Sequence, residues 1–187
     1  MKRMKWLVIC GLLIGLGALA WAIPNKVEQS RQQVETIKAS KVAVTTVAAI
    51  GRDAPDFKLQ ALSGEDVRLS DFKGKTVILN FWTTWCTYCK KEIPELINFH
   101  HLYKKEEVVV IAVNLSSEEE NIENVAMFAK EFEIPFLVPL DKEGEVGKAY
   151  QIIMIPTTFI INPEGKIQNK IMGPVKLDQL KQQLKGS

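Results

Sequence analysis

The stretch TVILNFWTTWCTYC at residues 76–89 decides the fold. Its first half is a continuous run of β-branched, aliphatic and aromatic side chains that only Asn80 interrupts. Such a run favours a central strand that is buried on both faces of a parallel sheet. Residues 86–105 then follow a helical pattern, with a kink expected at Pro94. The sequence therefore predicts a buried strand that gives way to a helix at two cysteines.

Similar patterns divide the rest of the chain into short elements. Further strands are expected at residues 56–62, 66–69, 108–114, 157–162 and 166–172, with an extended segment at 136–140. Further helices are expected at residues 118–133, 145–150 and 176–184. This order predicts an α/β fold with a central mixed β-sheet flanked by helices. The first two strands form an extra N-terminal β-hairpin ahead of that sheet.

The first 23 residues predict a membrane segment. Residues 6–23 are 18 consecutive residues without a charge. As a helix they would extend roughly 27 Å, close to the thickness of the hydrocarbon core of a bilayer. Lys2, Arg3 and Lys5 precede this run and favour a cytoplasmic N-terminus. We therefore expect residues 1–23 to be a single-pass transmembrane signal-anchor that leaves the remaining chain on the extracytoplasmic side of the cell membrane.

A cleaved signal peptide is the alternative for this segment. Ala20-Trp21-Ala22 resembles the small-x-small pattern of a cleavage site, and both interpretations export the rest of the chain. Residues 24–50 show no core-forming pattern and are interpreted as a tether. The predicted folded domain therefore spans residues 51–187.

The composition argues for a single domain and against nucleic-acid binding. The chain has 187 residues, which is enough for one core of ordinary size. Without the three cations at the N-terminus it carries 21 basic and 22 acidic residues. This balance lacks the excess of positive charge that marks a nucleic-acid-binding surface. We therefore expect no nucleic-acid partner.

Cys86 and Cys89 form a Cys-x-x-Cys pair at the expected strand-to-helix junction. Two cysteines at this spacing can form a disulfide and still expose one sulfur at the start of the helix. Backbone N–H groups and the helix dipole stabilise a thiolate there, which lowers the thiol pKa below its usual ~8.5. Cys86 is therefore the expected nucleophile. Cys89, one turn further into the helix, is expected to resolve the mixed disulfide.

A zinc site and a static disulfide are the alternatives for this cysteine pair. Zinc normally needs a second pair of ligands. The candidates are Cys10 in the membrane segment and the adjacent His100 and His101, whose spacing fits no common zinc finger. A static disulfide that closes a two-residue loop contributes little stability. We expect a redox-active disulfide between Cys86 and Cys89, and no metal.

Three motifs resemble the thioredoxin superfamily: NFWTTWC at residues 80–86 followed by Cys89, MIPTTF at 154–159 and GRDAPDF at 51–57. With the preceding anchor, the last motif is similar to the membrane-anchored TlpA/ResA-like branch. The resemblance covers about residues 51–184 in order. It implies a thioredoxin-like fold and a thiol-disulfide oxidoreductase. It also implies that the bond before Pro156 is cis and opposite the cysteines, so that the backbone at Ile155 can pair with an extended substrate.

The resemblance also suggests a proton carrier. Thioredoxins place a buried Asp six residues before the nucleophile, where this chain has Asn80, which cannot titrate. In the ResA branch a Glu three residues after the second cysteine is held to take that role, and Glu92 is the matching residue. Helical spacing brings Glu92 onto the face of Cys89, where a partly buried carboxylate can accept the thiol proton near neutral pH. An exposed Glu92 without a catalytic role is the alternative.

Two aromatic residues flank the expected nucleophile. Trp85 is expected to shield the disulfide and contact substrate, with packing in the core as the alternative. Tyr88 stands where Pro is frequent in the family, and it is interpreted as a substrate contact or as a cover over the helix start. Because the residues between the cysteines influence the reduction potential, the direction of electron flow stays open.

These features predict an extracytoplasmic reductase of protein disulfides that needs no cofactor. The outside is oxidising, and the resemblance implies a transmembrane thiol electron donor. It also points to apocytochrome c as the substrate, in cytochrome c maturation, with other envelope proteins as the second possibility. The alternatives are a peroxiredoxin-like peroxidase, because that group shares the GRDAPDF motif, a disulfide oxidase acting on other envelope proteins, and a non-catalytic binding module.

Overall fold

The computed structural model describes residues 47–103 and 107–185. The predicted signal-anchor and all but the last four residues of the predicted tether lie outside the described residues. Within the described ranges, no helix combines the length and the apolar character needed to cross a bilayer.

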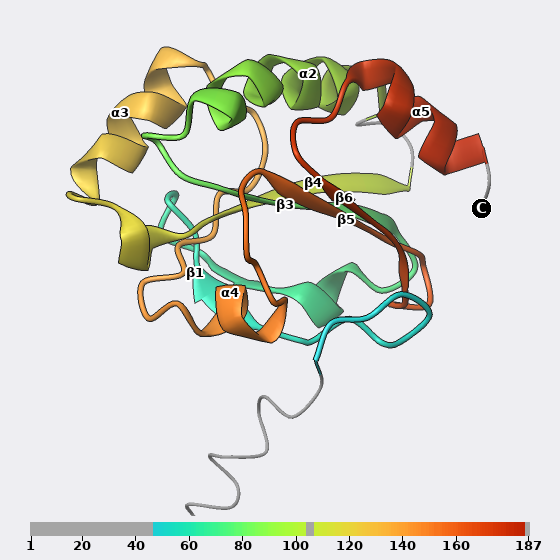
Figure 1. Ribbon diagram of the computed structural model, residues 1–187. Helices are drawn as coiled ribbons and strands as arrows, with labels where there is room; N and C mark the ends of the chain where they lie inside the picture. Colours follow the sequence, from blue (N-terminus) through green and yellow to red (C-terminus); the bar gives the residue numbers. More distant parts are fainter. Residues whose placement is uncertain (1–46, 104–106, 186–187) are drawn as a thin grey trace, which may run out of the picture. The chain divides into compact units, whose positions relative to one another are not determined.

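A four-stranded sheet forms the centre of the domain, in the order β4-β3-β5-β6 (Figure 1). Its strands are β3 (Thr76–Trp82), β4 (Val108–Asn114), β5 (Thr157–Ile161) and β6 (Ile167–Met172). β3 runs parallel to β4 and antiparallel to β5, and β6 is antiparallel to β5. The separate hairpin of β1 (Lys58–Gln60) and β2 (Asp66–Arg68) precedes them. The predicted mixed sheet with an extra N-terminal hairpin is therefore confirmed.

Helices cover both faces of this sheet (Figure 1). α2 (Thr87–Tyr103), α3 (Glu123–Glu131) and α5 (Leu177–Lys185) contribute buried side chains to one apolar cluster. α4 (Glu145–Ala149) and the 3-10 turn η1 (Leu69–Phe72) contribute to a second cluster on the opposite face. The sheet thus separates two apolar cores.

The alternation of side chains along β3 decides what faces α2. Ile78 and Trp82 belong to the cluster under α2, whereas Val77, Leu79 and Phe81 belong to the opposite one. Asn80 is two residues from both Ile78 and Trp82, and side chains at a spacing of two share a face. Asn80 therefore lies on the α2 side, buried in the middle of the sheet.

The helix predicted at residues 118–133 is shorter than expected. The chain forms a 3-10 turn η2 (Ser116–Glu118), and α3 begins at Glu123. The N–H of Glu123 donates to Asn121 Oδ1 at 3.1 Å, a local bond that Asn side chains make in turns. α3 ends before Glu133, which takes a φ of 51°. Residues 119–122 are thus part of a loop next to the end of β4.

Candidate active site

Cys86 and Cys89 lie where β3 gives way to α2. Cys86 precedes the first residue of α2, Cys89 is in its first turn, and the two form a disulfide. Cys86 retains 7% exposure, whereas Cys89 is fully buried. Only the sulfur of Cys86 is therefore open to attack from outside the domain.

The start of α2 supplies a hydrogen-bond donor to this sulfur. The backbone N–H of Cys89 donates to Cys86 Sγ at 3.1 Å. A donor at a helix N-terminus stabilises negative charge on a cysteine sulfur once the disulfide is reduced. The geometry gives Cys86 the features of an attacking thiolate and gives Cys89 those of a protected second thiol.

The segment around Pro156 lies against the reactive sulfur, although it is distant in sequence. The Ile155–Pro156 bond is cis, as the resemblance implied. The carbonyl oxygen of Ile155 is 3.9 Å from Cys86 Sγ. Pro156 is buried, and its carbonyl accepts a hydrogen bond from the N–H of Gly173 at 2.8 Å. The residue that follows β6 thereby holds the Pro156 backbone, and with it the Ile155 carbonyl, next to Cys86.

Glu92 is a buried carboxylate one helical turn after Cys89. Only 1% of it is exposed, so the exposed alternative was wrong. Oε2 accepts from Asn80 Nδ2 at 2.9 Å, and Oε1 accepts from the N–H of Val175 at 3.0 Å and from Thr158 Oγ1 at 3.4 Å. Burial raises the pKa of Glu92 from 4.5 to about 7, and the three donors oppose part of that rise. Glu92 can therefore exchange a proton near neutral pH.

Asn80 joins this carboxylate to the sheet. Its Nδ2 also donates to Thr158 Oγ1 at 2.9 Å, so one amide group connects β3, β5 and α2. Its Oδ1 is buried and has no hydrogen-bond partner among the described residues. Asn80 thus occupies a buried position beside Glu92 and leaves the titrating role to the glutamate.

Trp85 and Tyr88 are surface residues. They are 55% and 60% exposed, so Trp85 does not pack in the core. Trp85 Nε1 donates to the carbonyl of Glu118 at 3.0 Å, and the Nζ of Lys91 lies 5.7 Å from the centre of the Tyr88 ring. Both rings are available to a protein that approaches Cys86.

Glu119 is a site residue that the sequence analysis missed. Its Oε1 accepts from the N–H of Thr84 at 2.7 Å and from Asn114 Nδ2 at 2.8 Å, and its Oε2 accepts from Thr84 Oγ1 at 2.6 Å. One carboxylate therefore ties the turn before Cys86 to the end of β4. Nothing in the run Glu118-Glu119-Glu120 distinguishes this residue, because two of its three hydrogen bonds come from Thr84, 35 residues earlier.

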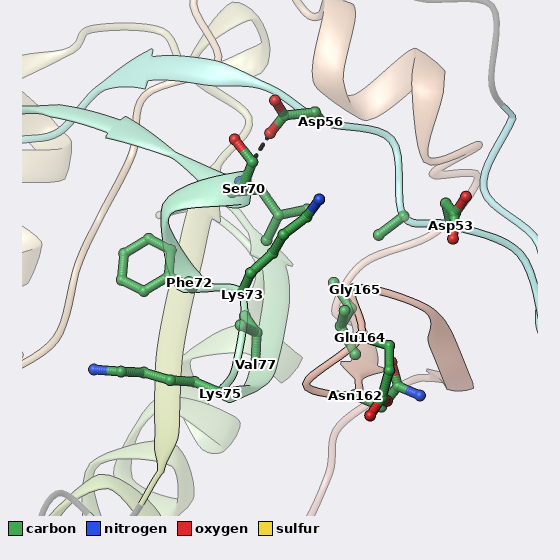
Figure 2. A pocket seen from close by; sticks show the side chains of 13 residues that line it. Asp53, Asp56, Ser70, Phe72, Lys73, Lys75, Val77, Asn162, Glu164 and Gly165 are labelled. Carbon is green, nitrogen blue, oxygen red and sulfur yellow. Dashed lines mark hydrogen bonds between the residues drawn. The ribbon is translucent and has the colours of Figure 1, made fainter.

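A cavity of about 280 Å³ lies away from the cysteines, and its walls include Asp53, Lys73, Val77 and Ile161 (Figure 2). Val77 pairs with Ile161 at the beginning of β3, whereas the cysteines follow its end. In the part of the chain that the structure describes, no cluster of three or more His, Cys, Asp or Glu side chains is arranged to hold a metal ion.

Comparisons with known proteins identify the family of the chain. The model of the AhpC/TSA family matches residues 50–170. Thiol-disulfide oxidoreductase ResA of Geobacillus thermodenitrificans is 38% identical over 80% of this chain and 84% of its own length. ResA of Bacillus subtilis is 37% identical over 92% of this chain and 87% of its own length.

Solved structures of similar fold include further thiol-disulfide exchange proteins. StoA from Bacillus subtilis superposes with a TM-score of 0.63 at 38% identity, covering 69% of this chain and 96% of StoA. A protein described as a putative thiol:disulfide interchange protein DsbE, from Chlorobium tepidum, has a TM-score of 0.68 at 31% identity, covering 74% and 97%. The fold is thioredoxin-like, as predicted. The chain belongs to the AhpC/TSA family of thioredoxin-like proteins, and it is a thiol-disulfide oxidoreductase similar to ResA.

Proposed function

We propose that this oxidoreductase is a membrane-tethered, extracytoplasmic reductase of protein disulfides. The observation that carries the proposal is the buried Glu92 carboxylate, which follows the buried Cys89 by one helical turn and has a pKa of about 7. A proton acceptor at this position allows the second thiol to become a nucleophile near neutral pH. A binding module would not need such a group.

The reaction proceeds through two exchanges. The Cys86 thiolate attacks one sulfur of a substrate disulfide, so that a mixed disulfide forms and the other substrate sulfur leaves as a thiolate. Cys89 then gives its proton to Glu92 and attacks Cys86 Sγ. This step breaks the mixed disulfide and releases the second substrate thiolate. Two electrons have passed to the substrate, and the chain holds the Cys86–Cys89 disulfide.

The surface around Cys86 fits a polypeptide substrate. The Ile155 carbonyl lies next to the reactive sulfur and can accept a hydrogen bond from an extended chain, as an edge strand does. Trp85 and Tyr88, which precede and follow Cys86 in the sequence, offer exposed aromatic surface at the start of the helix. We assign substrate binding to these three residues and to Pro156, which fixes the Ile155 backbone.

Location and electron supply are inferred from the sequence. The uncharged run at residues 6–23 supports a membrane anchor, and the preceding cations support an extracytoplasmic domain. A reductase in an oxidising compartment must be recharged, for which we propose a transmembrane thiol donor. We propose apocytochrome c as its substrate, with other envelope proteins as the second candidate.

Trapping in cells tests the reaction and the substrate together. In Cys89→Ser the mixed disulfide on Cys86 cannot be resolved, so substrate proteins should accumulate as covalent adducts, with the Cys86→Ser/Cys89→Ser double variant as background. Recovery of apocytochrome c would support the proposed substrate. The absence of any adduct above background would overturn the catalytic assignment.

Direction and location need separate measurements. The reduction potential of the Cys86/Cys89 couple should lie well below that of a dedicated oxidant, which is about −120 mV. A potential near that value would replace the reductase with an oxidase, and peroxide consumption at enzymatic rates would replace it with a peroxidase. Protease added to cells without their wall should digest the domain, and full protection would contradict the extracytoplasmic location.

A further inference from the structure

The turn that carries the nucleophile is held by a loop from the neighbouring strand. Residues 83–86 connect β3 to α2, and residues 115–122 follow β4, which is parallel to β3. Both connections therefore leave the sheet at the same end, where the two parallel strands finish. Glu119, in the second connection, accepts two hydrogen bonds from Thr84 in the first connection and one from Asn114 at the end of β4.

These bonds satisfy both oxygens of a half-buried carboxylate. Thr84 donates through its backbone N–H at 2.7 Å and through Oγ1 at 2.6 Å, and Asn114 Nδ2 donates at 2.8 Å. Hydrogen bonds to an ionised group are shorter and stronger than those between neutral groups. Two of the three donors belong to Thr84, two residues before Cys86.

The same loop also fixes Trp85. The carbonyl of Glu118, one residue before Glu119, accepts from Trp85 Nε1 at 3.0 Å. Asn114 is itself held, because Ser116 Oγ donates to its Oδ1 at 2.8 Å. The loop thus contacts the two residues that immediately precede the nucleophile and has its own support in β4.

We propose that Glu119 is a positioning residue that clamps the Thr84–Trp85 turn. The clamp keeps Cys86 Sγ within hydrogen-bond distance of the Cys89 N–H, and it also holds the Trp85 ring in place for substrate. The inference rests on the proposed nucleophilic role of Cys86. Glu119 does not touch the reacting sulfurs in this assignment. It acts through backbone geometry, and a misplacement of about 1 Å can cost as much as a hundredfold in rate.

Three substitutions separate geometry from charge. Glu119→Ala removes all three acceptor contacts. Glu119→Gln removes only the charge, because its Oε1 can accept from the Thr84 N–H and Asn114 while its Nε2 donates to Thr84 Oγ1. Glu120→Ala is the matched control, since Glu120 is an exposed neighbour whose side chain makes no hydrogen bond or ion pair in the described part of the chain.

The readout is the pH profile of Cys86 alkylation in the reduced full-length chain, measured together with the rate of protein-disulfide reduction. Global stability does not set the midpoint of this profile. We expect the midpoint of Glu119→Ala to lie above that of Glu119→Gln, because only the Ala variant loosens the turn. We expect disulfide reduction to slow about tenfold in Glu119→Ala and to stay near wild type in Glu119→Gln and Glu120→Ala.

Two results would overturn the clamp. Equal midpoints and rates in the Ala and Gln variants would mean that only the charge matters. A wild-type profile in Glu119→Ala would mean that the turn holds its geometry without the clamp. The nucleophilic role of Cys86 is tested separately, in the wild-type chain. If the midpoint of Cys86 alkylation there is not below that of an ordinary thiol, that role is contradicted, whatever the Glu119 variants show.

Discussion

The two ends of the central sheet differ in the solvent exposure of their polar groups. Where β3 begins, the walls of the 280 Å³ cavity carry Asp53, Lys73 and Lys75, and the Asp53–Lys166 ion pair nearby is solvent-exposed on both sides. Where β3 ends, Asn80, Glu92 and Thr158 are buried together around a single carboxylate. The polar groups at the first end are exposed to solvent, and those near the second end are buried.

Buried polar groups, and not exposed ones, mark the reactive site in this fold. Water solvates exposed charges well, so an exposed ion pair contributes little to the free energy of unfolding, and its loss changes stability little. Burial of a carboxylate is costly and moves its pKa, so it persists only with specific partners. The predictions below test this contrast, beginning with the cysteines themselves.

Loss of the nucleophile should have the largest effect. Cys86→Ser should reduce turnover of a protein disulfide to the background rate, because the remaining active-site thiol, Cys89, is fully buried and cannot attack the substrate. A coupled assay with the full-length chain and a chemical reductant measures this. Cys10→Ser removes the third cysteine of the chain and serves as the control. Equal loss in both variants would contradict the assignment of Cys86.

Glu92→Gln should change both activity and the pH dependence of stability. Without a proton acceptor for Cys89, we expect exchange at neutral pH to fall by about 10²-fold. Stopped-flow measurement of the resolving step tests this, because the first attack by Cys86 should keep its rate. A slowed first attack with a normal second step would assign Glu92 to another role.

The stability effect has a definite sign. The pKa of Glu92 is raised from 4.5 to about 7, so between these values the unfolded chain releases a proton that the folded chain retains. The contribution of Glu92 to the free energy of unfolding should therefore be largest below pH 4.5 and fall by about 3 kcal/mol as the pH rises from 4.5 through 7. Denaturant unfolding of the oxidised chain at several pH values measures it. Glu92→Gln should remove this part of the slope, and an unchanged slope would contradict the assignment.

The strands at this end could be predicted because their signal is local. β3 and β4 have the bounds expected from their continuous apolar runs, and Cys86 and Cys89 are adjacent to one of them. The region from 118 to 122 could not, because a run of glutamates suits a helix as well as a loop. Only the bonds from Thr84, 35 residues earlier in the chain, show that Glu119 belongs to the site.

The sequence left the state of Glu92 open between a partly buried proton acceptor and an exposed side chain, for the same reason. Its position after Cys89 is visible in the sequence, but its burial depends on Asn80, Thr158 and Val175, which come from three other segments. A pKa depends on desolvation and on partners, and neither is a local property. Sequence identified which group could carry the proton, and the fold determines at which pH it does so.

Thr158→Val tests the network with a smaller change. The hydroxyl donates to Glu92 and accepts from Asn80, so its loss should cost about 1 kcal/mol of stability. Because one donor to the ionised carboxylate is removed, the pKa of Glu92 should rise further, and the fall in stability should shift to higher pH. The same unfolding series measures both. A shift to lower pH would contradict the hydrogen bond from Thr158.

Lys166→Met at the other end of the sheet should have the smallest effect. The substitution breaks the ion pair with Asp53, in which the two side chains are 50% and 76% exposed. Water replaces the lost partner on each side, so no buried charge is left without solvation. We therefore expect an unchanged rate of disulfide exchange and a denaturation midpoint within error of wild type, measured beside Thr158→Val under the same conditions. A loss of exchange in Lys166→Met would show that the two ends are coupled through β3 and β5, and it would break the contrast between an exposed and a buried polar group on which the other predictions depend.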